Sequence, residues 1–493
     1  MQLPTACCLL ALACGTAVAQ FDPQNNQWGK DDPADLRVMT FNVKDHLCSS
    51  NTKTDIFGSW NAMVRVIAAM EPDVIVFQEA GDNTGNGTGS GVDSPAILEN
   101  VARLMFIGGT DPYRGNVTIT SFVQAFRPGY DLPHVFVSTE TDGFNRNVIV
   151  SRFPFADLDG DATATRSDIV LVDPDEWAPG GDGGIRGFMT AEIDLPDATY
   201  AGDLVIANAH LKAGGSSSDR AQRLVASQNA SYYFYYQYFG AGGPIPDPNN
   251  KIRRGGGNIV LDDNTPIIIA GDLNEDESTN GRRGPADYLA RGGGFGGSNG
   301  TDADQSDGVI ADAREPFTNS DNTLGGSTLD YQIVSDSRAT IRNAFIFDSF
   351  DAANAGNLPA ELAGFPRNES SVSSLASDHL PVIVDYILEP AGAIRSALAR
   401  RIRHRRQPPD DLRVGSLDQR DRVPAHRRRR RPARKPHHRS SRHHGHQLRP
   451  RCAARPLHAI FLDGRRHRSR GLARSDQQPR HLLHHLPRRP LER

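Results

Sequence analysis

The sequence predicts an α/β sandwich built from mixed β-sheets, and three observations support this fold class. Short apolar runs bounded by Gly, Pro or Asn recur between residues 36 and 388, and they have the length of buried strands. Segments with apolar residues at helical spacing separate some of these runs, whereas other runs follow one another directly. Several runs end abruptly in acid, amide or imidazole side chains. Together these patterns indicate sheets of mixed strand direction that are covered by helices.

The N-terminus differs from the body that follows it. Residues 1–19 contain no charged side chain, have an apolar centre and end in small residues, which is typical of a secretory signal peptide cleaved before Gln20. We therefore expect a secreted or periplasmic protein with a polar leader at residues 20–35. Later apolar runs are too short to span a bilayer, so we expect no stable membrane insertion.

Charge divides the chain into an acidic body and a basic tail. Residues 391–493 hold 30 of the 55 Lys and Arg residues and 7 of the 59 Asp and Glu residues, so residues 1–390 carry 25 basic and 52 acidic side chains. The tail also holds 12 of the 16 His residues and a single Lys. One interpretation is a disordered arm that binds nucleic acid, and the other is an out-of-frame translation. Neither forms a core, so we predict one domain at residues 36–390.

Strands and helices alternate through the first half of the body. The patterns predict strands at residues 36–43, 73–79, 146–151 and 188–193, and helices at residues 60–70 and 97–104. The second half is expected to contain strands at residues 204–211, 267–270 and 328–334, a turn into a last strand within residues 377–384, and a helix at residues 218–239. Residues 82–94 are rich in Gly, Asn and Thr, which indicates a surface loop.

The run Ile267-Ile268-Ile269-Ala270 is followed at once by Gly271-Asp272-Leu273-Asn274. Side chains two residues apart just past a strand end project in the same direction, and catalytic groups are often placed in such loops. Asp272 and Asn274 are therefore candidate functional residues. The alternative is a polar turn in which both side chains bond to the nearby backbone.

Further strand ends carry the same kind of side chain. They are Asn42, Glu79, His210, and Asp378 with His379, and Asp330 lies early in its strand. Carboxylate and amide oxygens suit a hard divalent cation such as Mg²⁺, Mn²⁺ or Ca²⁺. The sequence contains no Cys/His cluster with zinc spacing.

Six short blocks, in this order, resemble those of the endonuclease/exonuclease/phosphatase superfamily. They are Thr40-Phe41-Asn42, Gln78-Glu79, Asn208-x-His210-Leu211, Gly271-Asp272-x-Asn274, Leu329-Asp330-Tyr331 and Ser377-Asp378-His379-x-Pro381. The resemblance implies the deoxyribonuclease I-like fold, a four-layer α/β sandwich of two packed mixed β-sheets flanked by helices. It spans about residues 36–388, which is essentially the whole body.

The resemblance also implies a role for each residue. Glu79 would be the principal metal ligand with Asn42 and Asp378 nearby, and Mg²⁺ would be the preferred metal, with Mn²⁺ or Ca²⁺ as alternatives. Asp272 and Asn274 would orient the attacking water and the phosphate, His210 and His379 would contact or protonate phosphate oxygens, and Asp330 would hold the tautomer of His379. Which of Asp272, His210 and His379 acts as acid or base stays open. No carboxylate partner for His210 can be identified from the sequence.

These implied roles predict a metal-dependent phosphoesterase. The segment Phe144-Asn145-Arg146 is similar to the phosphate-contacting segment of secreted deoxyribonucleases, which makes Arg146 a candidate phosphate ligand and favours a nucleic acid as the substrate. The acidic body opposes this prediction, because it repels polyanions. The alternatives are a sphingomyelinase-like lipid phosphodiesterase, a small-molecule phosphatase and, least favoured, a non-catalytic binding protein with the same fold. No protein partner is indicated, and we expect a monomer.

Overall fold

The computed structural model describes residues 20–81, 93–139, 141, 145–158, 166–170, 187–238, 261, 264–291 and 308–392. The predicted signal peptide, Phe144 and the basic tail from residue 393 lie outside the described residues. The chain divides into units at residues 1–412 and 413–493, and only the first contains described residues.

Two six-stranded sheets form the centre of the first unit. One sheet comprises, in spatial order, β15 (Ala339–Ile346), β16 (Val382–Leu388), β3 (Leu36–Asn42), β4 (Val74–Gln78), β8 (Val148–Ser151) and β7 (His134–Val137). The other comprises β13 (Val309–Ile310), β14 (Asp330–Val334), β12 (Ile267–Asp272), β11 (Leu204–His210), β10 (Gly187–Ile193) and β9 (Arg166–Val170). In each sheet the two central strands, β3 with β4 and β11 with β12, are parallel, and their outer neighbours are antiparallel. Both sheets are therefore mixed, as predicted.

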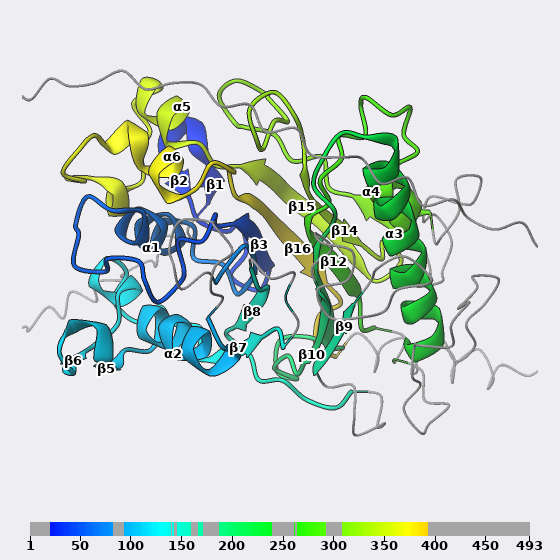
Figure 1. Cartoon of the computed structure of the whole chain (residues 1–493), viewed down its shortest axis with the longest axis horizontal. Helices are drawn as coiled ribbons and strands as arrows, with labels where there is room; N and C mark the ends of the chain where they lie inside the picture. The colour runs from blue at the N-terminus through cyan, green and yellow to red at the C-terminus, as the bar shows by residue number, and fades with distance from the viewer. Residues whose placement is uncertain are drawn as a thin grey trace, which may run out of the picture. The chain divides into compact units, whose positions relative to one another are not determined.

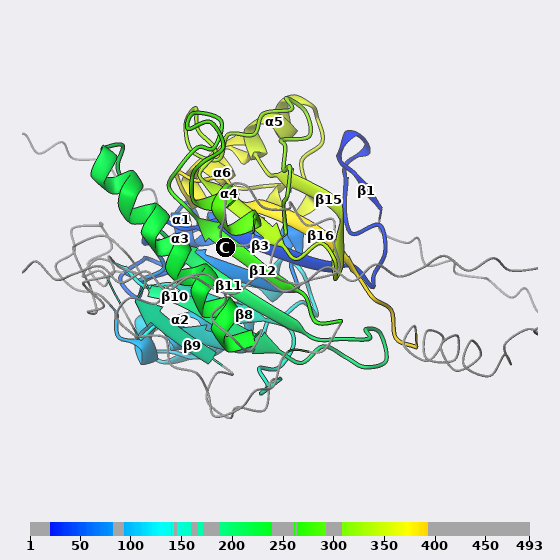
Figure 2. The same ribbon diagram turned by 90° about the vertical axis from the view of Figure 1, so that its right-hand side faces the viewer.

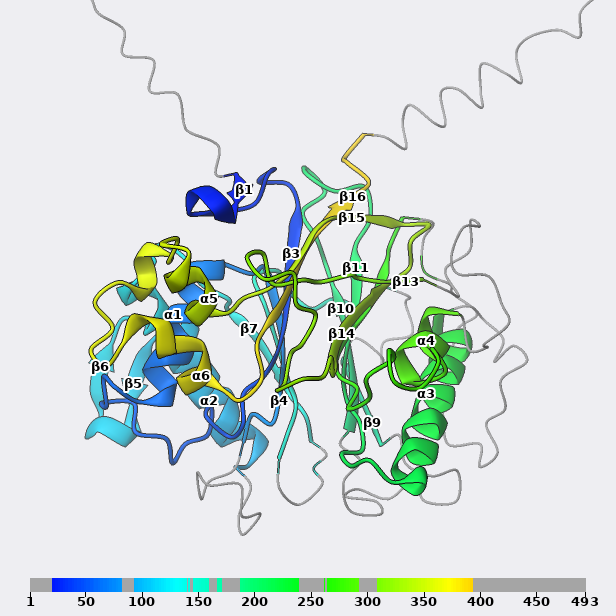
Figure 3. The same ribbon diagram turned by 90° about the horizontal axis from the view of Figure 1, so that it is seen from above.

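Helices cover the outer face of each sheet, which gives four layers (Figure 3). The first sheet is covered by α1 (Ser59–Met70), α2 (Pro95–Phe106), α5 (Ser349–Asn354) and α6 (Val372–Ala376). The second sheet is covered by α3 (Ser217–Tyr238) and α4 (Pro285–Ala290). The two groups of helices lie on opposite sides of the strands in Figure 1. In Figure 2, α3 lies in front of the second sheet. The predicted four-layer sandwich is confirmed.

Short elements complete the described fold. They are two hairpins, β1 (Phe21–Asp22) with β2 (Gln27–Trp28) and β5 (Gly109–Asp111) with β6 (Val117–Ile119), and 3₁₀ turns at Pro23–Asn25, Pro112–Arg114, Val123–Ala125, Ala360–Leu362 and Glu369–Ser371. The first hairpin falls in the predicted leader, where the buried Trp28 packs edge-on against Phe347. The packed body therefore begins before residue 36. In the described part of the chain, no helix combines the length and the apolar character needed to cross a bilayer.

Strand alternation explains where the site forms. Successive side chains of a strand point to opposite faces, so Leu36, Val38, Thr40 and Asn42 of β3 share the face toward the second sheet. Leu36 and Val38 belong to the apolar core between the sheets, whereas Thr40 and Asn42 continue the same buried face with polar groups. β11 repeats this order, with Leu204 and Ile206 followed by Asn208 and His210. The space between the sheets is therefore apolar at one end and polar at the other.

Gly271 is required by the close approach of two strands at this polar end. Its φ is +149°, and a Cβ atom added to it would lie 1.9 Å from the carbonyl oxygen of Ala209 on β11. We predict that Gly271→Ala destabilises the protein by at least about 3 kcal/mol, because the backbone of β12 would have to move away from β11. Urea unfolding checks this. Gly326→Ala is the matched control, since a Cβ there meets no atom within 4 Å. Equal stability of the two variants would contradict the prediction.

Candidate active site

Strand register places the predicted residues of the second sheet in one row. His210 on β11 pairs with Asp272 on β12, and Asp272 pairs with Asp330 on β14. All three are buried, with 1% to 3% of their surface exposed. The row lies at the carboxyl ends of the two parallel strands and at the start of the antiparallel β14. Three residues that are far apart in sequence are therefore neighbours across one sheet.

The first sheet presents a matching row. Asn42 on β3 pairs with Gln78 on β4, and Glu79 follows directly. The two rows meet across the gap between the sheets, because the Asn42 side-chain nitrogen donates a hydrogen bond to Asp272 Oδ2 at 3.0 Å. His379 joins the group from the loop before β16, which pairs with β3.

Asp272 lies at the centre of this group. Its Oδ2 is 3.5 Å from His210 Nε2 and 3.9 Å from His379 Nε2, and its Oδ1 accepts a hydrogen bond from the backbone N–H of Asn274 at 2.9 Å. Burial and the nearby carboxylate of Asp330 raise the pKa of Asp272 to about 7, and His379 and Asn42 oppose this rise only in part. Asp272 therefore gains or loses its proton near neutral pH.

His379 and Asp330 form a buried pair. His379 Nδ1 is 2.8 Å from Asp330 Oδ2, so Nδ1 carries a proton and donates a hydrogen bond to the carboxylate. Burial lowers the pKa of His379, but the carboxylates of Asp330, Asp272 and Asp378 outweigh it and raise this pKa to about 10. At neutral pH the ring is therefore a cation whose Nε2–H faces the centre of the site. The predicted contact between Asp330 and His379 is present.

Two carboxylates lie beside His210, for which sequence reasoning found no partner. Its Nε2 is 3.5 Å from Glu79 Oε1 and equally far from Asp272 Oδ2. The His210 side chain is 1% exposed, whereas that of Glu79 is 24% exposed. Glu79 also has a positive φ of 51°. Glu79 is therefore the carboxylate through which this buried group reaches solvent.

Asn274 sits in the loop after β12 with a φ of +55°. Its side-chain nitrogen donates to the carbonyl oxygen of Leu211 at 3.1 Å, and the N–H of Leu211 donates to the carbonyl of Asp272. Both side chains therefore bond to nearby backbone, as the polar-turn interpretation expects, but Asp272 Oδ2 also bonds to Asn42 of the other sheet.

The structure places Asp378 and Arg146 at the border of this group. The Asp378 side chain is 42% exposed and forms an ion pair with Lys44 at 2.7 Å; although burial raises the pKa of Asp378, Lys44 and His379 lower it overall. The carbonyl of Arg146 accepts a hydrogen bond from Ala80, directly after Glu79. The Arg146 guanidinium donates to the carbonyls of Asp93, Ser138 and Thr139, so it ties two loops together at the border. Its phosphate contact stays a prediction.

The buried donor set fits a hard divalent cation. Glu79, His210 and Asp272 each offer one ligand atom within 4.8 Å of the others, and so do Asp272, Asp330 and His379. In the second group the Asp330–His379 hydrogen bond already joins two members, whereas the first includes the solvent-accessible Glu79. Burial and the nearby carboxylates of Asp330 and Glu79 raise the pKa of Asp272, and a bound cation would oppose this rise. Of the predicted metal ligands, Glu79 thus lies with Asp272 and His210, Asn42 bonds to Asp272, and Asp378 lies outside both groups.

Sequence reasoning gave no role to the polar side chains that hold the two sheets together beneath the site, although Gln78 and Asn208 belong to the quoted family blocks. Gln78 donates to Asn208 Oδ1 at 2.8 Å, and Asn208 donates to the carbonyls of Phe77 and Val148. Gln332 on β14 bridges to the carbonyls of Val38 and Val382. Strand alternation could have identified them. Asn208 and Gln332 each lie two residues from a site residue on the same strand face, and Gln78 directly precedes Glu79.

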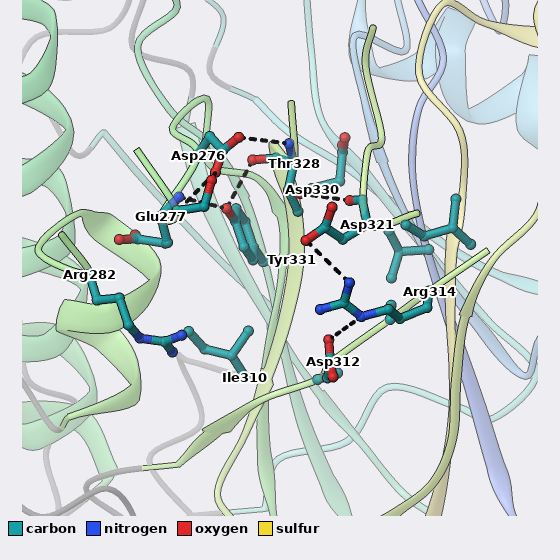
Figure 4. A pocket seen from close by; sticks show the side chains of 15 residues that line it. Asp276, Glu277, Arg282, Ile310, Asp312, Arg314, Asp321, Thr328, Asp330 and Tyr331 are labelled. Carbon is teal, nitrogen blue, oxygen red and sulfur yellow. Dashed lines mark hydrogen bonds and ion pairs between the residues drawn. The ribbon is translucent and has the colours of Figure 1, made fainter. Parts of the chain in front are cut away.

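A cavity of about 370 Å³ opens behind the start of β14 (Figure 4). Asp330 is the one predicted site residue that lines it. Two arginines at its rim are already paired, Arg314 with Asp312 and Asp321, and Arg282 with Asp287. The cavity therefore adds no uncompensated positive charge beside the site.

The fold and this donor set place the protein among the phosphoester hydrolases. The chain belongs to the Endonuclease/Exonuclease/phosphatase family, whose sequence model matches residues 39–379. This match covers every predicted site residue. Members of this family generally use a divalent metal, in agreement with the donor set.

Several solved structures resemble the chain. An endonuclease/exonuclease/phosphatase from Beutenbergia cavernae shares 19% identity with a TM-score of 0.37, and 72% of each chain is covered. The mannosyl-6-phosphatase of Bacteroides thetaiotaomicron shares 16% identity (TM-score 0.36; 72% of this chain and 100% of that chain). Sphingomyelinase C from Streptomyces griseocarneus shares 15% (TM-score 0.35; 71% and 99%). No protein of curated function matches the sequence.

Proposed function

We propose that this protein is an exported, divalent-metal-dependent phosphodiesterase that cleaves nucleic acid. One observation carries the proposal: Asn42 and Glu79 of one sheet face Asp272 and His210 of the other, with His379 beside them. The similarity of residues 144–146 to a nuclease segment supports nucleic acid as the substrate. Export rests on the signal-peptide pattern of residues 1–19.

The chemistry follows from the arrangement of the side chains. A divalent cation held by Glu79, with Asp272 and His210 beside it, would neutralise charge on the phosphate oxygens. Asp272 is buried at the centre of this group, and its carboxylate can act as the general base that takes a proton from the attacking water. Asn42 and the backbone of Asn274 fix its two oxygens. The cationic His379 is placed to donate its Nε2 proton toward a phosphate or leaving oxygen.

Removal of divalent metal is expected to abolish hydrolysis. The purified protein would be assayed with a chelator and then with Mg²⁺, Mn²⁺ or Ca²⁺ added back in excess. We expect a loss of at least about 100-fold, because several kcal/mol of charge stabilisation would disappear, and we expect recovery with at least one cation. Full activity in chelator, after dialysis against it, would show that the carboxylate group works without metal and would overturn the proposal.

The substrate is tested with DNA, RNA, sphingomyelin vesicles and phosphate monoesters, assayed side by side in the presence of metal. Cleavage of DNA or RNA that disappears in Asp272→Asn supports the nuclease. Hydrolysis of vesicles alone would move the same residues to a lipid phosphodiesterase, and hydrolysis of monoesters alone would move them to a phosphatase. Hydrolysis of none of the four would overturn the proposed activity.

A further inference from the structure

We propose that Arg223 is a positioning residue that holds in register the loop that follows His210 and the loop that contains Asn274. Arg223 lies on α3, which covers the outer face of the second sheet, and its residue surface is 2% exposed. It does not belong to the group around Asp272. The inference rests on the proposed phosphodiesterase function, and it names a residue that would set the geometry of that site from outside it.

The Arg223 side chain donates hydrogen bonds to both of these loops. Its Nη1 donates to the carbonyls of Lys212 at 2.7 Å and Gly214 at 2.8 Å, in the loop that follows His210. Its Nε donates to Glu275 Oε2 at 2.7 Å, and Glu275 directly follows Asn274. One guanidinium therefore joins the segments that leave β11 and β12.

The two loops are bonded to each other at the same level. Asn274 donates to the carbonyl of Leu211, and Leu211 donates to the carbonyl of Asp272. Leu211 is adjacent to both His210 and Lys212. A shift of Glu275 is therefore transmitted to Asn274 through one peptide unit, and a shift of Lys212 is transmitted to His210 through two.

A second anchor fixes the other side of the Asn274 loop. The Tyr331 hydroxyl accepts a hydrogen bond from the N–H of Glu277 at 3.2 Å (Figure 4). The same hydroxyl donates to the carbonyl of Glu275 at 3.0 Å. The other carboxylate oxygen of Glu275 accepts from Asn280 at 2.9 Å. With Tyr331 fixed on β14, Arg223 determines how the loop is held toward β11.

A positioning role explains why this pair is ionic and why it contains arginine. A buried ion pair adds little stability over an apolar pair of similar volume, because both charges lose their hydration. The planar guanidinium can donate to three acceptors at once, which a lysine ammonium on a flexible stem cannot do in the same geometry. The Arg223–Glu275 pair therefore contributes defined geometry more than net stability.

The test compares Arg223→Met with Arg220→Met, an exposed arginine on the same helix. Because misplacement of a reacting group by about 1 Å can cost about 100-fold in rate, we expect Arg223→Met to lower kcat by about 10- to 100-fold, with KM changed less than about threefold. Arg220→Met should match the wild type, and Arg223→Lys should not restore kcat. Wild-type kcat in a folded Arg223→Met variant would overturn the proposal.

A double-mutant cycle separates positioning from a general structural defect. If Arg223 acts through Asn274, Arg223→Met should lower kcat by less than about threefold in an Asn274→Ala background. An equal loss in both backgrounds would show that Arg223 acts elsewhere. If Arg223→Met does not fold, Glu275→Gln takes its place in the same cycle, because it removes the charge but keeps the side-chain shape.

Hydrogen exchange provides a readout that does not depend on activity. Arg223→Met or Glu275→Gln should raise backbone exchange in residues 211–216 and 274–280 together, whereas Arg220→Met should not. Unchanged exchange in both segments would overturn the positioning role. Absence of metal-dependent hydrolysis by the wild type would instead overturn the proposed function, and the exchange data would still decide the role of Arg223.

Discussion

His379→Ala is expected to lower kcat by about 1,000-fold, the middle of the range for loss of a general acid or base. The variant removes a ring whose Nε2 lies 3.9 Å from Asp272 and whose Nδ1 is held by Asp330. Since the pKa of His379 is about 10, the ring is protonated from pH 6 to 9, and the loss should be of similar size throughout this range. The kcat of a cleaved substrate, measured across this range, checks the prediction.

His134→Gln is the control for this variant, because His134 lies on the edge strand β7 outside the group around Asp272. Asp330→Asn should lower kcat in the same direction as His379→Ala, since it removes the carboxylate that holds the proton on Nδ1. Wild-type kcat in folded His379→Ala would mean that another group donates to the phosphate oxygens.

Asp272→Asn is expected to lower kcat by about 1,000-fold and to stabilise the metal-free protein by about 2 kcal/mol at pH 8. The pKa of Asp272 is about 7 in the folded protein, against the ordinary value of 3.8 for an aspartate in water. The folded state therefore binds this proton more tightly than the unfolded state does. The contribution of this carboxyl to stability is therefore present at low pH and is lost as pH rises from about 4 to 7. The amide keeps the shape and removes the charge.

Urea unfolding in chelator at pH 5 and pH 8 measures both parts of this prediction, with kcat determined in metal. The stability gain of Asp272→Asn should be large at pH 8 and small at pH 5, and excess Mg²⁺ should reduce it because a bound cation stabilises the wild type. Asp312→Asn, at a 79% exposed carboxylate, is the control. A variant less stable than the wild type at pH 8 would show that the carboxylate is favourable without metal.

Most of the framework could be predicted from the sequence, because each signal is local. The strands at residues 36–42, 204–210 and 267–272 read as apolar runs with polar ends, and those ends carry Asn42, His210 and Asp272. The start of β14 was predicted two residues early, since Thr328 and Leu329 continue the apolar pattern before the ladder begins. β7 and β15 were not predicted.

The family resemblance implied the contact between Asp330 and His379, but the contacts between the two sheets could not be predicted, because they depend on how the sheets pack. The proximity of Glu79 to His210 and the bond from Asn42 to Asp272 both cross that gap. The link from Arg223 to Glu275 joins a helix to a loop 52 residues away, and no local pattern marks it. Sequence motifs therefore named the members of the site, while the structure supplied their pairing.

The order of strands in the first sheet has a consequence for synthesis of the protein. β3 is the first long strand of the body, yet its neighbour β16 is the last, and Arg37 on β3 forms its buried ion pair with Asp385, 348 residues later. Long-range pairing of this kind forms only when both strands are present. His379 precedes β16, so it can reach the other site residues only after nearly all of residues 36–388 have been made. A growing chain would therefore lack a complete site until almost the whole body has been made. Any product that stops before residue 379 would not hydrolyse the phosphoesters of the cell that makes it.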